Sequence, residues 1–262
     1  MDNSNKQLIS DDNFINDPLV GRTTLKECVL KNELKGKLEP IESQIFVTEK
    51  DETEKQYWDS YYSDNRNIAT YNPPSQFAAF FLTELVGLNI NTIIDIASGD
   101  GRDSLFFAQY GYEVIAVEKS REAVAYTQKI AQNFDNLNVI NLDITKEQIS
   151  SELVQGKSKV FYARFFIHTL TVSELALFFD NISKIMKRGD YLFLEYRNKD
   201  DAVRKKITPK HFRAFYTADF VSDKAMERGL QCSYEEKGTG FAKWGEDNAS
   251  VSRQIFQKSL KY

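Results

Sequence analysis

The chain has 262 residues, 42% of them hydrophobic, and its 34 Lys and Arg residues are outnumbered by 38 Asp and Glu, which gives a formal net charge of −4. This length accommodates one large α/β domain with an extension, and the apolar content suffices for a sizeable core. General binding to nucleic acid requires an excess of basic residues, so we expect no nucleic-acid partner.

Neither the cysteines nor the amino terminus indicates secretion. Cys28 and Cys232 form no disulfide framework and no metal-ligand spacing, and the first residues lack the basic and apolar segments of a signal peptide. No apolar run is long enough to span a bilayer. The sequence therefore predicts a soluble cytoplasmic protein with reduced thiols and no bound metal.

Residues 1–50 are interpreted as a polar, partly helical extension of a domain that spans residues 51–262. Apolar residues recur at helical spacing between positions 23 and 38, which predicts an accessory helix that packs on the domain or on a second copy of the chain. In the second case the extension would support a homo-oligomer. An apolar island at Ile45–Val47 indicates a short extended segment.

A predicted helix ahead of the first strand of the domain is unusually aromatic. Four of its residues lie within six positions: Tyr57, Trp58, Tyr61 and Tyr62. Rings at this density need an apolar partner, so they cover either a ligand or the core of the domain. Pro73 and Pro74 end this segment, and residues 77–86 predict an apolar helix that leads to the first strand.

The stretch from residue 92 to residue 118 carries the strongest signal in the chain. It consists of a buried strand (92–96), a turn of small residues (97–101), a helix (103–110) and a second strand that ends at Glu118. Gly99 and Gly101 permit main-chain angles closed to other residues and let a ligand approach the backbone at the start of the helix. Glu118 can accept hydrogen bonds from two ribose hydroxyls. This is a nucleotide-binding βαβ unit.

The turn distinguishes two types of nucleotide cofactor. A dinucleotide fingerprint would need glycine in place of Ala97 and Ser104, so NAD is disfavoured. Four positions instead resemble the D/E-x-G-x-G-x-G motif of Rossmann-like methyltransferases, which bind S-adenosylmethionine (SAM): Asp95, Ala97, Gly99 and Gly101. Ala97 departs from that motif at its first glycine.

The resemblance implies which further residues surround the cofactor. In this family the aromatic helix lies over the cofactor, so Trp58, Tyr61 and Tyr62 become candidate lid residues, and Lys119 borders the site beside Glu118. A positive sulfonium next to an aromatic face is favourable by roughly 0.5–2 kcal/mol.

The third strand is predicted over residues 138–144, after a helix over residues 121–134. The resemblance implies that an acid at its end accepts from the adenine amino group while the next N–H faces the ring, and Asp143 and Ile144 fill those positions. Asp143 could instead cap a helix that continues through Glu147.

The fourth strand, residues 159–164, runs into Arg164 and His168, at a strand end that in this family faces the methyl group and the acceptor. Arg164 could hold a carboxylate or phosphate, and a neutral His168 could take a proton from a hydroxyl. Alternatively, Arg164 pairs with a nearby acid and His168 is satisfied by the backbone.

A helix over residues 171–187, with capping-box spacing at its start, leads into a fifth strand over residues 190–197. Glu195 and Arg197 at the end of this strand either border the acceptor pocket or are solvated.

A basic and aromatic cluster follows, made of Lys210, His211, Arg213 and Tyr216. It is typical of an insertion that binds an anion or a sugar, and the alternative is a surface helix that buries Phe212 and Phe215. A helix (217–229) and an antiparallel pair (231–236 and 250–258) complete the chain. This order of elements fits an α/β fold, the seven-stranded Rossmann-like sheet of the methyltransferase family with helices on both faces.

We therefore expect a SAM-dependent methyltransferase. The G-R-D-S-L-F-F-A run at residues 101–108 resembles bacterial small-molecule and surface-polysaccharide enzymes, which implies O-methylation of a sugar, phosphate or phosphoramidate group in capsule biosynthesis. His168 or His211 would act as the base, and Arg164 or Arg213 would orient an anion. Similarity to tellurite-resistance and thiopurine-type enzymes implies transfer to a soft anion or amine instead. A non-catalytic SAM-binding module is the third hypothesis.

Overall fold

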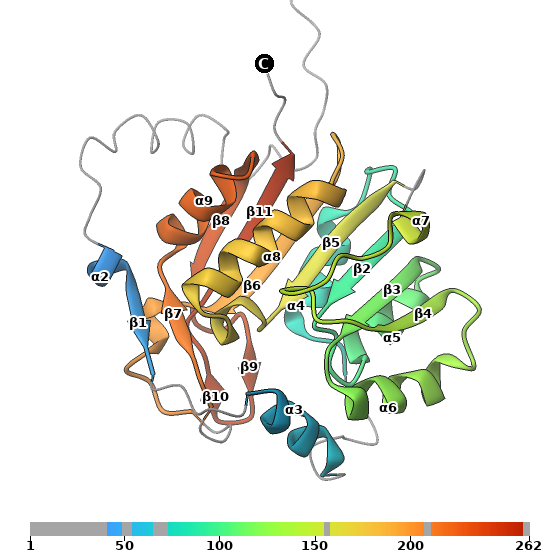
Figure 1. The fold of residues 1–262 in the computed structure, drawn as a ribbon, viewed down its shortest axis with the longest axis horizontal. Coiled ribbons are helices and arrows are strands. Elements are labelled where there is room, and N and C mark those ends of the chain that lie inside the picture. Colours follow the sequence, from blue (N-terminus) through green and yellow to red (C-terminus); the bar gives the residue numbers. More distant parts are fainter. Residues whose placement is uncertain (1–40, 49–53, 65–72, 155–157, 207–210, 259–262) are drawn as a thin grey trace, which may run out of the picture.

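The computed structural model describes residues 41–48, 54–64, 73–154, 158–206 and 211–258. A seven-stranded sheet lies at its centre in the order β4-β3-β2-β5-β6-β11-β8 (Figure 1). The parallel strands are β4 (Leu137–Asn141), β3 (Glu113–Glu118), β2 (Thr92–Ile96), β5 (Lys159–Arg164) and β6 (Tyr191–Arg197). The antiparallel strand β11 (Val251–Lys258) lies between β6 and β8 (Leu230–Gly238).

The order of the strands fixes where a ligand can bind. The chain runs outward from β2 to β3 and β4, and then crosses back to β5 on the other side of β2. Open α/β sheets bind their ligands beyond the carboxyl ends of the strands at such a reversal of order. The turn that follows β2 and the segment that follows β5 therefore face the same crevice.

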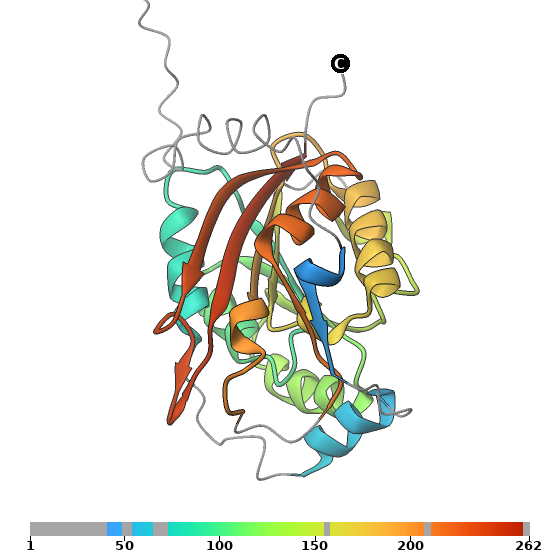
Figure 2. The same ribbon diagram turned by 90° about the vertical axis from the view of Figure 1, so that its left-hand side faces the viewer.

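Helices cover both faces of the sheet (Figure 2). One face packs α4 (Gln76–Glu84), α5 (Arg102–Gln109) and α6 (Arg121–Ala131), and the other packs α8 (Val172–Ile185) and α9 (Ala218–Met226). All residues of β2 are buried. Ile93 packs in the hydrophobic core under α4 and α5, and Ile94 and Ile96 pack in the core under α8 and α9. Because side chains alternate along a strand, a strand covered on both faces is mostly apolar, and β2 departs from this only at Thr92 and Asp95.

The remaining helices are α2 (Ile41–Gln44), α3 (Glu54–Ser63), α7 (Ser151–Val154) and the 3₁₀ helices η1 (Ile167–Thr169) and η2 (Lys199–Asp201). Two antiparallel pairs join β1 (Ile45–Val47) to β7 (Ala214–Tyr216) and β9 (Lys243–Trp244) to β10 (Asp247–Asn248). Figure 1 shows α3 beside α6, below the carboxyl ends of the parallel strands.

The fold class predicted from the sequence is confirmed, and the strands at 92–96 and 159–164 have the predicted bounds. The capping box at the start of α8 is also confirmed, because Thr171 Oγ1 accepts from the Glu174 N–H while the Glu174 carboxylate accepts from the Thr171 N–H at 2.8 Å. The surface helix considered around residue 213 is wrong, because β7 is a buried strand held by β1.

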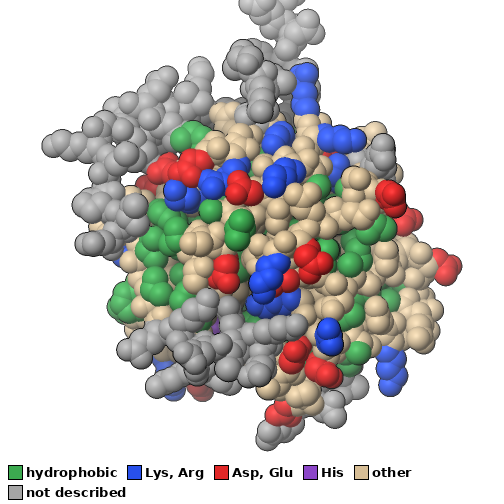
Figure 3. Space-filling model, in the orientation of Figure 1, with side chains coloured by type: hydrophobic (Ala, Val, Ile, Leu, Met, Phe, Trp, Pro, Cys, Tyr) green, Lys and Arg blue, Asp and Glu red, His purple; other side chains and the backbone are tan. Residues whose placement is uncertain are grey.

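Several expectations concern residues outside the described ranges: the helix at 23–38, its role in a homo-oligomer, Cys28 and Lys210. Cys232 is a thiol whose Sγ donates to the Tyr234 carbonyl, at 3.1 Å. On the face seen in Figure 3, Lys and Arg side chains are interspersed with Asp and Glu. None of the helices in the described ranges is both long enough and apolar enough to cross a membrane.

Candidate functional site

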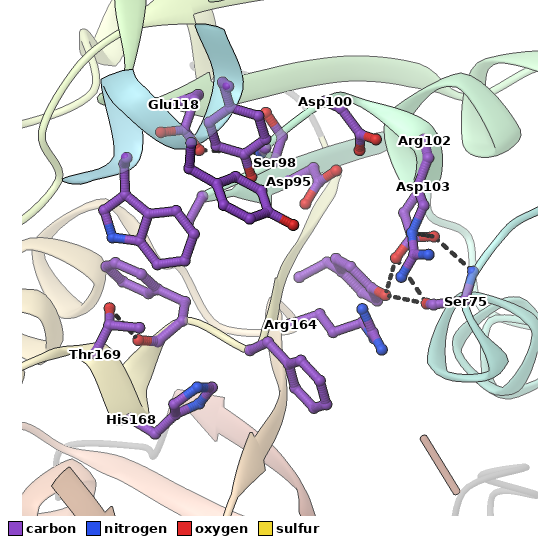
Figure 4. Close-up of a pocket in the computed structure, with 18 of the residues that line it drawn as sticks. Ser75, Asp95, Ser98, Asp100, Arg102, Asp103, Glu118, Arg164, His168 and Thr169 are labelled. Carbon is purple, nitrogen blue, oxygen red and sulfur yellow. Dashed lines mark hydrogen bonds and ion pairs between the residues drawn. The ribbon is translucent and has the colours of Figure 1, made fainter. Parts of the chain in front are cut away.

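A cavity of about 670 Å³ opens at the carboxyl ends of the parallel strands. Its walls come from α3, from the turn after β2, from the ends of β3 and β5, from the start of β7 and from the β9–β10 hairpin. In the close-up, Asp95, Asp100 and Glu118 lie in one part of the cavity and Arg164 and His168 lie across from them (Figure 4). We call these two parts the acidic end and the basic end.

The turn at the acidic end uses the left-handed backbone region three times. Ala97, Gly99 and Gly101 have φ values of +54°, +59° and +75°. Ala97, at the position where the methyltransferase motif has its first glycine, therefore adopts a left-handed angle at a conformational cost of about 1–2 kcal/mol. A Cβ on Gly99 would come within 2.5 Å of Tyr62 Oη, so this glycine lets α3 approach the turn.

Glu118 ends β3 and faces the same turn. One of its oxygens accepts from the Gly99 N–H at 3.0 Å, and the other accepts from the Ser120 N–H at 2.8 Å. Burial raises the pKa of Glu118, although these backbone hydrogen bonds and Lys119 oppose the shift. Each carboxylate oxygen keeps a further lone pair, so Glu118 can still accept from the two hydroxyls of a ribose.

Asp95 lies deeper, at the end of β2. Its Oδ2 accepts from Ser104 Oγ at 2.5 Å, which ties β2 to the first turn of α5. Burial raises the pKa of Asp95 well above its usual value, and the hydrogen bond from Ser104 only partly opposes this. Next to it, the buried Ser98 Oγ has no hydrogen-bond partner among the described residues. A buried hydroxyl without a partner is a place where a ligand can bind.

The aromatic helix predicted as a lid does border the cavity. Trp58 stacks on Tyr62 with 6.1 Å between ring centroids, and both residues line the cavity together with Tyr57 and Tyr61. Asp59 fixes this helix to α6, because its Oδ1 accepts from Ser120 Oγ at 2.7 Å and from the backbone at the start of α6.

Asp143 and Ile144 line the cavity, as the family resemblance implies. The Asp143 carboxylate also accepts from the backbone N–H and the hydroxyl of Thr145, at 3.1 and 2.6 Å. Burial would raise the pKa of Asp143, but the hydrogen bonds from Thr145 and Lys146 outweigh it, so the pKa is lowered. Asp143 therefore holds a turn, but the helix through Glu147 that it was expected to cap does not form.

Arg164 stands at the basic end. Its Nε donates to Glu195 Oε1 at 3.0 Å, and Arg253 Nε donates to the other oxygen of Glu195 at 2.9 Å. Burial opposes the charge of Arg164, but Glu195 and Asp103 outweigh it and raise the pKa. The expectation that Glu195 is solvated is wrong, because its side chain is buried between two guanidinium groups, behind the cavity wall.

Both histidines line the basic end. His168 is buried, and its Nδ1 has no hydrogen-bond partner among the described residues, so it is not satisfied by the backbone. Burial lowers the pKa of His168 well below its usual value, and Arg197 lowers it further. His211 Nδ1 lies 2.8 Å from the Phe212 carbonyl, and burial together with Arg213 lowers its pKa to about 4. Both rings are therefore neutral at pH 7.

Two groups of residues in the wall of the cavity were not predicted from the sequence. Asp103 accepts from Ser75 Oγ and from Tyr162 Oη, each at 2.7 Å, which joins α4, α5 and β5 beneath the cavity. On the other side, the β9–β10 hairpin is attached through Asp247, which pairs with Arg197. No local pattern marks these partners, because they are far apart in the sequence.

The residues predicted to bind the cofactor or to act in catalysis all line this one cavity except Gly101, which supports the turn from behind, where a Cβ would meet Thr127 at 2.4 Å. Glu195 and Tyr216, which were also candidates, do not line it. The acidic end fits an adenosine cofactor: Glu118 is placed for ribose, Asp143 for an amino group, and the Ser98 hydroxyl is available. Within the described part of the chain no cluster of His, Cys, Asp and Glu could hold a metal ion.

Comparison with known proteins gives the same family. The family model described as tellurite resistance protein TehB matches residues 60–202, more than half of the chain. The glycine N-methyltransferase of Mus musculus is 24% identical over 181 residues, which is 63% of this chain and 59% of that protein. The chain thus spans 59% of the length of this curated relative and of its Homo sapiens counterpart, which is 22% identical.

Solved structures share the fold. A TehB-like SAM-dependent methyltransferase from Corynebacterium glutamicum is similar with a TM-score of 0.57 and 15% identity, over 78% of this chain and 99% of that one. The glycopeptide N-methyltransferase MtfA in complex with SAM gives 0.56 and 15%, over 71% and 95%. A Burkholderia thailandensis 1,6-didemethyltoxoflavin-N1-methyltransferase gives 0.58 and 11%, over 79% and 87%. The chain belongs to the TehB family of SAM-dependent methyltransferases.

Proposed function

We propose that this protein transfers a methyl group from SAM to a small polar acceptor. The observation that carries the proposal is Glu118, whose carboxylate is held by the N–H groups of Gly99 and Ser120 at the mouth of a left-handed turn. That arrangement recognises a ribose beside a main chain that a ligand can approach. Membership of the TehB family supports the same cofactor.

Few chemical groups are needed for this reaction. When bound, SAM supplies a methyl group on a positively charged sulfur. The residues of the chain have to align the acceptor with that methyl group and exclude water. The α3 lid, fixed to α6 by Asp59, closes the cavity over the acidic end. Arg164, held by Glu195, sets the position of an acceptor at the basic end.

For the acceptor we propose a hydroxyl or phosphate-type oxygen on a sugar or phosphorylated intermediate, of the kind used in capsule or surface-polysaccharide biosynthesis. The basic end supports an acceptor that carries negative charge, since Arg164, Arg197 and Arg213 all line it. Neutral His168 would accept a hydrogen bond from the reacting hydroxyl. Its depressed pKa makes it a weak base, so an acceptor that is already ionised fits the basic end better.

A second candidate is transfer to a soft anion or amine. The match to the tellurite resistance family model favours it, and a cavity with several arginines accommodates an inorganic oxyanion as well as an organic one. In that case neither histidine has to remove a proton. A SAM-binding module without catalysis would bind the cofactor and transfer its methyl group to none of these acceptors.

Two measurements test these proposals. Calorimetry with SAM should show binding that Asp95→Ala and Glu118→Ala abolish while both variants keep their circular dichroism spectra. A radiolabelled methyl donor, offered with sugar phosphates, phosphoramidates, thiols, amines and tellurite, then identifies the acceptor class. Unchanged affinity in the Glu118 variant would remove the cofactor assignment, and binding without transfer to any acceptor would favour the module.

A further inference from the structure

Phe165 follows β5 and has a φ of +53°, in the left-handed region. For a bulky side chain this conformation is a genuine outlier that costs conformational free energy. It is held in place by its own N–H, which donates to the Glu195 carbonyl oxygen at 2.7 Å. A strained residue in the wall of a cavity indicates that the position of its side chain matters.

The ring of Phe165 lies among the groups of the basic end. The Arg164 guanidinium carbon is 4.2 Å from the ring centroid, and that of Arg197 is 5.3 Å from it. The His168 ring meets the same phenyl ring edge-on at 5.6 Å. Phe165 therefore contacts all three of these residues through its ring, and they come from β5, β6 and η1.

Arg164 is oriented from two sides. Glu195 accepts its Nε–H through the side chain and fixes the Phe165 backbone through the carbonyl, so one residue holds both the guanidinium and the ring beneath it. No other hydrogen bond of the Arg164 guanidinium is made within the described residues, and Arg164 lines the cavity. Its remaining N–H groups can therefore bind a ligand there.

The charges around Glu195 do not balance. This one carboxylate pairs with both Arg164 and Arg253, which leaves one positive charge in excess. Arg197 pairs with Asp201 and Asp247, and Lys206 shares Asp201, so that neighbouring cluster is neutral. A buried excess of positive charge is stabilised by an anion, and a guanidinium is suited to a carboxylate or phosphate.

We infer that Phe165 is a positioning residue that holds Arg164 against its ring so that the arginine binds an oxyanion, a carboxylate or phosphate, on the methyl acceptor. This inference rests on the proposed function. It adds to the anionic acceptor proposed there the residue that orients Arg164 toward it. Packing alone does not require an aromatic ring here, because Phe165 packs against a cluster of small and aliphatic residues, Ala242, Ala249 and Val251.

The experiment uses the full chain loaded with S-adenosylhomocysteine (SAH), whose own binding is measured first by calorimetry. Two pairs of probes are then titrated: glucose 1-phosphate with glucose, and 4-hydroxybenzoate with phenol. Each pair has one anionic and one neutral member. We expect at least one anion to bind at least tenfold more tightly than its neutral partner, and the pair that does so distinguishes a phosphate from a carboxylate.

Three variants of Phe165 separate positioning from strain. Phe165→Leu keeps an apolar side chain but removes the π face, and we expect it to weaken binding of the anion about fivefold or more. Phe165→Tyr keeps the ring and should retain the affinity within about twofold. Phe165→Gly relieves the backbone strain but removes the ring, so it should lose anion affinity like Phe165→Leu.

The matched control is Phe80→Leu. The guanidinium carbon of Arg253 lies 4.8 Å from the centroid of the Phe80 ring, but Phe80 does not line the cavity. It should leave anion binding unchanged. SAH affinity should stay the same in every variant. If SAH binds but the anions bind no better than their neutral partners, or Phe165→Leu binds them like the wild type, the inference is overturned and the proposed function stands. If SAH does not bind, the proposed function fails first.

Discussion

Ala97 offers a direct test of the turn at the acidic end. Its φ of +54° costs about 1–2 kcal/mol that glycine would not incur. Replacing Ala97 by glycine relieves this cost, but it removes a half-buried methyl group worth at most about 0.8 kcal/mol and makes the unfolded chain more flexible by about 0.4–1 kcal/mol. The net change in the free energy of unfolding of Ala97→Gly should lie near zero or be slightly stabilising.

The control is the same substitution at Ala125, an exposed position in the middle of α6. There alanine has an ordinary helical angle, and glycine costs about 1 kcal/mol. Both variants gain the same flexibility when unfolded, so urea denaturation should show Ala97→Gly to be more stable than Ala125→Gly by about 1–2 kcal/mol. SAH affinity should change little in either variant. Equal destabilisation by the two substitutions would refute the left-handed angle at residue 97.

Three further predictions concern the walls of the cavity. Glu118→Gln should weaken SAH binding about tenfold or more, because an amide cannot accept from both ribose and backbone donors. The control Glu113→Gln, at the exposed start of β3, should not weaken it, and equal affinities of the two variants would contradict the ribose assignment. Asp59→Ala should free α3 from α6 and so speed SAH dissociation about fivefold, measured by stopped flow. Ser60→Ala is the control, and an unchanged dissociation rate in Asp59→Ala would show that this contact does not hold the lid. The pKa of His211 is about 4 in the folded chain and about 6.5 in the unfolded chain, so acid favours unfolding. Between pH 7 and pH 5 the free energy of unfolding of the wild type should therefore fall by about 2 kcal/mol more than that of His211→Gln. Equal losses in the two proteins would place His211 in solvent.

The parts of the fold that could be predicted are those that local sequence determines. The isoleucine-rich pattern of β2 and the small residues that follow it depend on neighbours in the chain, and so does the capping box of α8. The predicted helix over residues 121–134 ends earlier, at Ala131, because the last residues form turns. Such ends depend on packing more than on propensity.

The basic end was only partly predictable, because its geometry comes from long-range pairs. Arg164, Arg197 and Glu195 were marked by their place at strand ends, but the sequence did not show that Arg164 pairs with Glu195, and Asp247 was not marked at all. Glu195 lies 31 residues beyond Arg164, and Asp247 lies 50 residues beyond Arg197. Hydrophobic periodicity carries no information about such pairs, since each charged residue on its own is typical of a solvated surface.

The two ends of the cavity also suggest how charge changes during the reaction. In the reaction we propose, Asp95, Asp100 and Glu118 at the acidic end face the positive charge on the sulfur of SAM, and Arg164 and its neighbours face the acceptor. Transfer of a methyl group from a cation to an anion removes both charges, and attraction between opposite charges is stronger in a buried cavity than in water. An anionic acceptor therefore needs no base. His168→Gln should then leave the maximal rate of transfer to an ionised acceptor within about threefold of the wild type, whereas a hydroxyl acceptor that depends on a base would lose about a hundredfold. The labelled-donor assay distinguishes the two, and a large loss with an ionised acceptor would refute the role we give to the charges.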